Sequence, residues 1–302
     1  MKRILITIDT EMDADCHWKK RKPVGYSSIL EGIPIIYRPI WDKYNIYPIY
    51  FVSPEVLGNE ECCKILREEI DKGAIIGAHL HPEYIEPEKE EIGKIEIEKF
   101  PCYGYSYEVE KNKIINLKAL IKNKLGVDPV WYRAARFGAD YDTIKILEET
   151  GFLYDSSFTP HIDWSEKGGP NHKEVGIEHY KIKGSNIMEF PVTILGKRFG
   201  IMGKLLPEKW IFYKWLRPTH MTYIEERNLI SQMAKKNIQN LVMMFHSMEV
   251  MINKTPYVRT KWMQDYYIWR LEKTIEYAKK RGYESYKLED KNNGCRLETT
   301  NI

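Results

Sequence analysis

The sequence has few cysteines and no pair of them in a motif typical of a metal or redox site. Five cysteines occur among 302 residues: Cys62 and Cys63 are adjacent, and the other three stand alone. Because no CxxC pair is present, the sequence supports neither a zinc ribbon nor a thioredoxin-type redox centre. An odd, unpatterned set of cysteines predicts free thiols, which are typical of a reducing cytoplasm.

Long hydrophobic runs and an excess of one charge are also missing. The first apolar run, residues 4–8, stops at Asp9, whereas a signal peptide needs about 7–15 apolar residues and a membrane span about 20. We therefore expect no secretion signal, no integral membrane segment and a cytoplasmic location. The 46 Lys and Arg nearly balance the 43 Asp and Glu, so composition predicts no nucleic-acid partner.

The sequence does contain a regular alternation of short apolar runs and helix-like segments. Apolar runs of the kind found in buried parallel strands lie at 4–8, 49–52, 74–76 and 241–245, with weaker ones at 130–132, 152–154, 187–190 and 283–286. Amphipathic segments that predict helices cover 60–72, 110–125, 141–150 and 261–281. This alternation predicts a parallel α/β architecture, with enough strands for a barrel or a distorted, incomplete one.

No internal repeat and no linker-like composition divides the chain. Residues 160–185 show little periodicity and contain the turn-forming run Gly-Gly-Pro-Asn at 168–171. We interpret this stretch as a long loop over the active face and not as a domain boundary. We expect one catalytic domain over residues 1–290 and a polar C-terminal tail over residues 291–302.

Ionisable residues are concentrated where the predicted strands end. Five apolar runs end in such residues, namely Asp9 with Glu11, His79 with His81, Arg133, Asp155 and His246. Because the working residues of α/β barrels lie at the carboxyl ends of the strands, we expect the active site there.

The spacing of these residues suits a metal site. Residues i and i+2 of an extended chain face the same side, so Asp9 pairs with Glu11 and His79 pairs with His81. Two imidazoles and one carboxylate on converging strand ends form a facial site for Zn²⁺, Fe²⁺, Co²⁺ or Mn²⁺. Asp13 continues the same spacing, and it is either a further ligand or part of a solvated loop.

Five short segments stand in a specific order: ITIDTE (6–11), IGAHLHPE (76–83), YRAARFGAD (132–140), GFLYDSS (151–157) and MFHSMEVM (244–251). Together they resemble the polysaccharide deacetylase family, carbohydrate esterase family four, and most closely its branch in lipopolysaccharide and O-antigen biosynthesis. The resemblance covers about residues 3–288. It implies an α/β fold, a distorted (β/α)7-type barrel with parallel strands in a single domain, and metal-dependent removal of an acetyl group from an N-acetylated sugar or glycan intermediate.

The resemblance also implies roles for individual residues. Asp9 matches the general base, Arg133 the arginine that orients it, and His246 the general acid. One divalent metal is implied, Zn²⁺ first and Co²⁺, Mn²⁺, Fe²⁺ or Ni²⁺ as alternatives, and its ligands match Glu11, His79 and His81. Candidate substrate-binding residues are Arg136, Trp164 and Tyr257. Either Glu249 or Asp163 is expected to be the carboxylate partner of His246.

Three features depart from the common family pattern. The second acid, Glu11, comes one residue later than usual, the histidines are spaced i, i+2 instead of i, i+4, and the arginine turn lacks its proline and gains Arg136. Two alternative functions stay open: a related hydrolase of a non-peptide C–N bond in a small molecule, and a non-catalytic carbohydrate-binding protein on the same fold. The complete acid, base and metal set argues against the second alternative.

Overall fold

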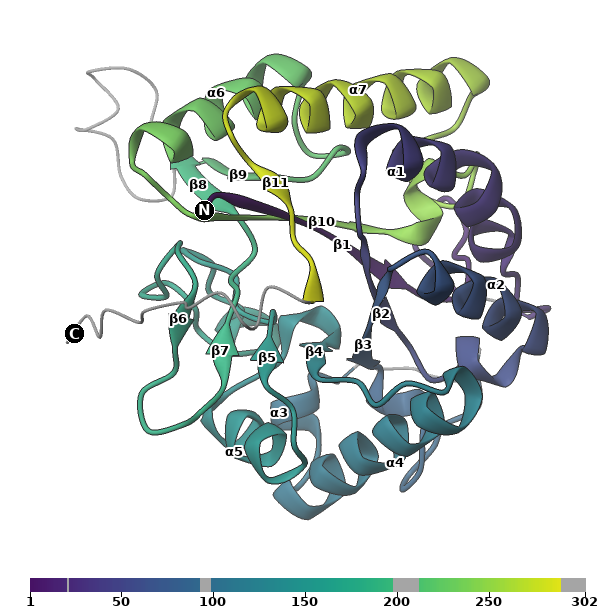
Figure 1. The fold of residues 1–302 in the computed structure, drawn as a ribbon. Coiled ribbons are helices and arrows are strands. Elements are labelled where there is room, and N and C mark those ends of the chain that lie inside the picture. The colour runs from purple at the N-terminus through teal and green to yellow at the C-terminus, as the bar shows by residue number, and fades with distance from the viewer. Residues whose placement is uncertain (21, 93–98, 198–211, 289–302) are drawn as a thin grey trace.

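A curled, mainly parallel sheet forms the centre of the molecule (Figure 1). The computed structural model describes residues 1–20, 22–92, 99–197 and 212–288. Neighbouring strands follow the order β10 (Asn240–His246), β1 (Arg3–Thr10), β2 (Ile49–Val52), β3 (Ile75–Leu80), β4 (Trp131–Ala134), β5 (Tyr154–Asp155), β7 (Met188–Glu189) and β6 (Tyr180–Lys181). All these pairings are parallel except the last, and β11 (Glu284–Ser285) also pairs with β1 in parallel.

Helices surround the outer face of this sheet (Figure 1). They are α1 (Arg38–Tyr44), α2 (Glu60–Asp71), α3 (Pro101–Gly104), α4 (Tyr107–Leu125), α5 (Tyr141–Glu149), α6 (Tyr223–Lys235) and α7 (Lys261–Lys280). A wide helical segment, Ser28–Tyr37, runs directly into α1. A separate antiparallel pair is formed by β8 (Ile194–Lys197) and β9 (Phe212–Trp215).

Loop hydrogen bonds bridge the gap between β7 and β10. The backbone N–H of Thr193 donates to the carbonyl oxygen of Val242 at 3.1 Å, and its hydroxyl accepts from the N–H of Val242 at 2.8 Å. Leu216 continues this contact, because its N–H donates to Thr193 and its carbonyl accepts from Met244. Single residues, and not a full strand, therefore close the barrel at this point, in keeping with the distorted barrel expected from the sequence.

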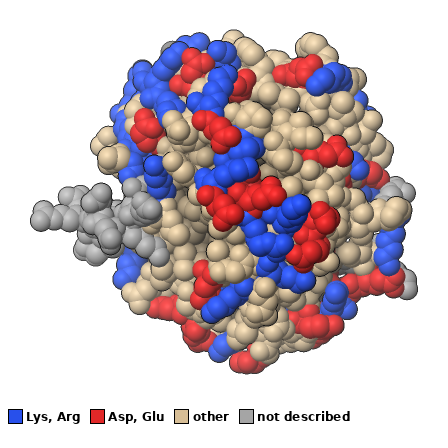
Figure 2. Space-filling view, turned by 45° about the vertical axis from the view of Figure 1, so that its right-hand side comes forward, with Lys and Arg blue, Asp and Glu red and all other residues tan. Residues whose placement is uncertain are grey.

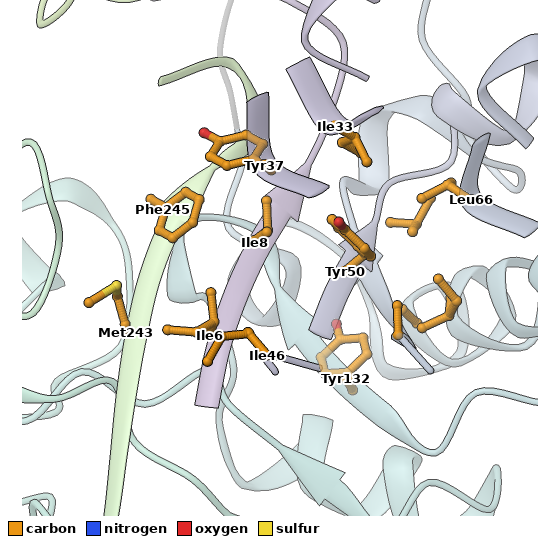
Figure 3. Close-up of a cluster of buried hydrophobic side chains, with 14 of the residues drawn as sticks. Ile6, Ile8, Ile33, Tyr37, Ile46, Tyr50, Leu66, Tyr132, Met243 and Phe245 are labelled. Atoms are coloured by element: carbon orange, nitrogen blue, oxygen red, sulfur yellow. The ribbon is translucent and has the colours of Figure 1, made fainter. Parts of the chain in front are cut away.

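Alternation along the strands separates the outer core from the barrel interior. On β1, Ile6 and Ile8 pack outward with Tyr37 and Phe245, as Figure 3 shows. Leu5 faces the opposite side and belongs to a smaller apolar cluster inside the barrel. Asp9 shares this inner face, so the interior is apolar near the amino ends of the strands and polar near their carboxyl ends.

The predicted strands and helices are confirmed, with boundaries that differ by a few residues. The sequence pattern did not predict α1, the segment Ser28–Tyr37, α3, α6 or the β8–β9 pair, and β6 lies in the stretch that it predicted to be a loop. Ser28–Tyr37 contains Pro34, which argues against a helix. By contrast, α6 begins with a capping box between Thr222 and Glu225, a signal that was available in the sequence. The predicted tail, residues 291–302, lies outside the described residues.

Acidic and basic side chains are interspersed on the face shown in Figure 2, in keeping with their nearly equal numbers. Within the described ranges, no helix combines the length and apolar character needed to span a bilayer. Cys16, Cys62, Cys63 and Cys102 are free thiols, as expected, and Cys295 falls outside the described part of the chain.

Candidate metal centre and active site

Strand register brings the predicted residues together at one end of the barrel. Asp9 lies opposite His246 across the β1–β10 pair, and His79 lies opposite Arg133 across the β3–β4 pair. Asp9, His79 and Arg133 are buried, and His246 is partly exposed. Residues far apart in sequence therefore share one small polar volume.

Glu11, His79 and His81 form a compact group of possible metal ligands. Their donor atoms all lie within 4.8 Å of one another, and all three side chains are buried. Oε1 of Glu11 lies 3.1 Å from Nε2 of His79 and 3.0 Å from Nε2 of His81. Both imidazoles thus point the same ring nitrogen at one carboxylate oxygen.

The partners of the other ring nitrogens indicate that this group fits a cation. Nδ1 of His79 lies 3.0 Å from the carbonyl oxygen of Arg133, and Nδ1 of His81 lies 3.2 Å from Oε1 of Glu83. Because both partners only accept, each Nδ1 carries a proton, and a neutral ring then presents a lone pair at Nε2. With a cation bound, both rings would be neutral and would offer these lone pairs to it beside the Glu11 carboxylate. Such orientation by outer partners is typical of metal-ligating histidines.

Charges around the group affect how its members titrate. Burial alone would raise the pKa of Glu11, but Lys20, His81 and His79 lower it well below its usual value. Nζ of Lys20 lies 2.6 Å from Oε2 of Glu11. Burial and Lys20 would lower the pKa of His81, but Glu11 and Glu83 outweigh them and raise it to about 9. Without a metal, His81 therefore carries a proton at neutral pH, which a bound cation would replace.

Asp9 is held by Arg133 through a single contact. Nη1 of Arg133 donates to Oδ1 of Asp9 at 2.7 Å, while Nη2 and Nε bind Thr7 and Ser156. Only one guanidinium nitrogen of Arg133 donates to Asp9, because the other two donate to Thr7 and Ser156. Burial would raise the pKa of Asp9, but the charge of Arg133, with those of His79 and His246, lowers it. Oδ2 of Asp9 lies 4.0 Å from Nε2 of His79.

Of the two carboxylates considered as partners of His246, Glu249 is in contact with it. Oε1 of Glu249 lies 3.1 Å from Nδ1 of His246 and also accepts from its backbone N–H at 2.9 Å. Arg217 donates to the same carboxylate oxygen. Burial would raise the pKa of Glu249, but Arg217 and His246 hold it well below its usual range. Asp163 instead binds Ser165 and Lys173.

Nε2 of His246 points toward the group of metal donors. It lies 3.7 Å from Oε1 of Glu11. Asp13, by contrast, is outside this group, because Oδ2 accepts from the N–H and hydroxyl of Ser27 and Oδ1 from the N–H of Ser28. Asp13 thus organises the start of the Ser28–Tyr37 segment.

The predicted substrate-binding residues occupy different positions. Arg136 donates to Glu83 and to the carbonyl oxygen of Lys99, so it lies behind the metal-ligand group. Trp164 donates its Nε1–H to Thr159 at 2.9 Å and packs against Phe137 and Trp215. Tyr257 contacts Trp18, and Trp18 contacts His246 with ring centroids 5.2 Å apart. Their roles in substrate binding stay predictions.

Sequence reasoning missed three charged residues of the site: Lys20, Glu83 and Arg217. Glu83 had a signal, because it extends the i, i+2 spacing of His79 and His81 by one more step. Lys20 and Arg217 lie in irregular segments, and no local pattern connects them with their carboxylate partners.

One comparison with a solved structure supports the fold. No family model matches the chain, and no curated protein matches its sequence. Among solved structures, a GH57 branching enzyme from Thermococcus kodakaraensis matches 98% of this chain and 72% of its own, with 12% identity and a TM-score of 0.51. A polysaccharide deacetylase from Bacillus cereus matches 96% of this chain and 94% of its own, with 12% identity and a TM-score of 0.42. The Xyl-CE4 domain of a xylanase from the Trinervitermes trinervoides hindgut metagenome covers 96% and 88%, with 12% identity and a TM-score of 0.47. At 12% identity the likeness to the branching enzyme concerns the fold alone, and the two structures with TM-scores below 0.5 add no argument.

Proposed function

We propose that this protein is a metal-dependent deacetylase that hydrolyses the N-acetyl group of a sugar. The observation that carries the proposal is the set of buried donors formed by Glu11, His79 and His81, with Asp9 on one side and His246 on the other. A possible base and a possible acid therefore flank one site for a cation, which is what amide hydrolysis requires.

Glu11, His79 and His81 would hold the metal. When bound, a divalent ion supplies Lewis-acid polarisation of the acetyl carbonyl and of a water molecule. The chain contributes the orientation of the ligands, because the Arg133 carbonyl and the Glu83 carboxylate fix which nitrogen of each imidazole faces the site. We propose Zn²⁺ first, since two imidazoles and a carboxylate are a common zinc donor set.

In this mechanism, Asp9 accepts the proton of the attacking water. Arg133 holds Oδ1 and leaves Oδ2 on the side of His79. Since Arg133 lowers the pKa of Asp9, the carboxylate is ionised at neutral pH and ready to take a proton. A buried base with a fixed direction loses little entropy when the reaction begins.

On the other side, His246 donates a proton to the departing amine nitrogen. An amine cannot leave as an anion, so its nitrogen must be protonated as the C–N bond breaks. Glu249 accepts from Nδ1 and stabilises the imidazolium, which then presents its Nε2–H toward the site. Arg217 fixes the position of Glu249.

The decisive experiment couples metal content to acetate release. Protein stripped with a chelator and reloaded with Zn²⁺, Co²⁺, Mn²⁺, Fe²⁺ or Ni²⁺ is incubated with N-acetylhexosamine-containing sugars, and released acetate is measured. His79→Ala and His81→Ala should lose metal and activity together. His161→Asn is a suitable control, because the ring of His161 stacks on Tyr213 and its φ of 71° is one that Asn tolerates. Full metal occupancy in both site variants would contradict the proposal.

The other outcomes separate the alternative functions. Acetate release from small acetamides but not from sugars would favour a small-molecule hydrolase. Sugar binding without any hydrolysis would favour a carbohydrate-binding protein. The resemblance of the sequence also supports a role in surface polysaccharide or lipopolysaccharide biosynthesis in the cytoplasm, as part of the proposal. Activity on lipid-linked or nucleotide-linked sugar precursors, compared with finished polysaccharide, tests that role.

A further inference from the structure

The turn after β3 carries two groups of the proposed metal centre, the ligand candidate His81 and its partner Glu83. Its backbone closes on itself, because the N–H of Glu90 donates to the carbonyl oxygen of Glu83 at 2.8 Å. Four carbonyl oxygens of this turn lie around one nitrogen atom, and they belong to Pro82, Ile85, Pro87 and Glu88. The turn therefore presents a cage of acceptors, which suits a cation.

Lys113, on α4, places its side-chain nitrogen in this cage. Nζ donates to the carbonyl oxygens of Pro82 and Ile85 at 2.7 Å and 2.8 Å, and also to that of Pro87. The carbonyl oxygen of Glu88 is farther away, at 3.5 Å. Three close carbonyl acceptors require three N–H donors, so the nitrogen is an ammonium ion and not a neutral amine.

This charge lies on the side of α4 that faces the core. Lys113 is fully buried, and it is one helical turn before the buried Leu117. Within the described ranges, none of its hydrogen bonds is to a carboxylate. A buried ammonium ion is costly unless its donors are used, and here backbone carbonyls use them while the ring of Tyr105 lies 4.7 Å from Nζ. The side chain of Lys113 therefore serves the turn and not the apolar core.

The cage adjoins the group of metal-ligand candidates. The carbonyl oxygen that Lys113 binds at 2.7 Å belongs to Pro82. Pro82 connects His81 to Glu83, whose carboxylate contacts Nδ1 of His81 at 3.2 Å. A second contact comes from the next turn of α4, where the side-chain amide of Asn116 donates to another carbonyl oxygen of the same segment at 2.8 Å. Thus α4 fixes the backbone that joins the ligand candidate to the carboxylate that orients it.

We infer that Lys113 is a positioning residue of the proposed metal centre, whose ammonium ion holds the turn after β3 so that His81 and Glu83 keep the geometry that binds the cation. The inference rests on the proposed function only for the nature of what His81 binds. It gives α4, which contributes none of the ligand candidates, a part in metal affinity. It also assigns this effect to the charge of Lys113 and not to the space that its side chain fills.

Lys118 provides a matched control on the same helix. Its Nζ also donates to two backbone carbonyl oxygens, those of Thr150 at 2.8 Å and Gly151 at 3.1 Å, and lies 4.7 Å from the centre of the Phe152 ring. These residues follow α5 and include no ligand candidate. Lys118→Met therefore removes the same kind of contact from a turn that has no part in the metal centre.

The first experiment compares the Zn²⁺ affinity of wild type, Lys113→Met and Lys118→Met by competition with a chromophoric chelator at constant pH. Methionine fills most of the same space without the charge, and circular dichroism establishes that each variant is folded. Lys113→Met should bind Zn²⁺ at least about 10-fold more weakly than wild type, as for other outer partners of metal ligands, and Lys118→Met should stay within about 2-fold. Equal affinities, or an equal loss in both variants, would overturn the inference.

Chemical rescue tests the charge itself. Lys113→Ala removes the side-chain atoms from Cγ to Nζ, which are the heavy atoms of n-propylammonium. Added n-propylammonium should restore the Zn²⁺ affinity of this variant, whereas 1-propanol, a neutral molecule of similar size, should not. The comparison also covers a variant that is unfolded alone, because the ammonium compound should then restore its circular dichroism together with its affinity. Recovery with both compounds, or with neither, would refute the role of the charge.

Hydrogen exchange in the chelator-stripped protein separates this inference from the proposed function. The N–H of Glu90 reports on closure of the turn, because the carbonyl oxygen of Glu83 protects it. Residues 82–90 should exchange at least about 10-fold faster in Lys113→Met than in wild type or Lys118→Met. Faster exchange without any Zn²⁺ binding by wild type would refute the metal centre and keep Lys113 as the residue that holds the turn. Zn²⁺-dependent acetate release by wild type, with unchanged exchange and affinity in Lys113→Met, would keep the function and refute the inference.

Discussion

Glu83 provides a sensitive test of the metal centre, because it acts on a ligand without being one. It is 2% exposed, and its Oε1 lies 3.2 Å from Nδ1 of His81. Glu83→Gln keeps an acceptor of the same shape but removes the charge. A charged hydrogen bond contributes about 1.5–3 kcal/mol and a neutral one about 0.5–1.5 kcal/mol, so the difference is about 1–2 kcal/mol. Arg136 would also lose its ion pair with Glu83.

We therefore expect Glu83→Gln to weaken metal binding by roughly 10–100-fold, the range found for outer partners of metal ligands. Competition with a chromophoric chelator measures this affinity for Zn²⁺ at constant pH. Glu88→Gln is the control, since Glu88 is exposed on the same loop. If Glu83→Gln is folded and binds Zn²⁺ as tightly as Glu88→Gln, the argument that Glu83 orients His81 is refuted.

Three further predictions follow from buried contacts. Arg133→Lys should lower kcat by roughly 10²-fold with little change in KM, because lysine cannot hold Asp9 in the same direction; weakened binding at normal kcat would instead indicate substrate recognition. Burial raises the pKa of Glu226 to about 8. Protonation of Glu226 therefore stabilises the fold fully below the unfolded-state pKa of about 4, and this contribution to the free energy of unfolding is lost as the pH rises to about 8. In urea denaturation, the free energy of unfolding of wild type should therefore fall between pH 5 and pH 8 by about 3 kcal/mol more than that of Glu226→Gln. The same pH dependence in both proteins would contradict this. Gly77→Ala should destabilise the fold by about 1–3 kcal/mol in the same assay, since its Cβ would lie 2.6 Å from the ring of Phe51, and an unchanged midpoint would show that the ring yields freely.

The site residues that the sequence predicted could be found because their positions follow from spacing along a single strand. Asp9 and Glu11, or His79 and His81, face the same side because a strand repeats every two residues. Their common end of the barrel follows from parallel strands whose working residues lie at the carboxyl ends. The fold class was predictable for the same reason, since strand and helix periodicity are local properties of the chain.

Strand order was not predictable in this way. The sequence does not state that β10, near the C-terminal end of the fold, lies beside β1, yet this neighbourhood places His246 opposite Asp9. The charges that tune the site also come from distant irregular segments. Lys20 reaches Glu11 from the loop after β1, and Arg217 reaches Glu249 from the segment after β9.

The carboxylate partner of His246 depends both on local sequence spacing and on contacts with distant residues. Two carboxylates were candidates, and the chain turns directly after β10 so that Glu249, three residues on, contacts both the backbone and the ring of His246. Asp163 has no such constraint and is already satisfied by Ser165 and Lys173. Of the two candidates left open by the sequence, the structure places Glu249 in contact with His246. The low pKa of Glu249 depends on Arg217, whose position is set by the loop hydrogen bonds that close the barrel. The chemistry of the proposed acid is therefore a property of the closed barrel and not of its motif alone.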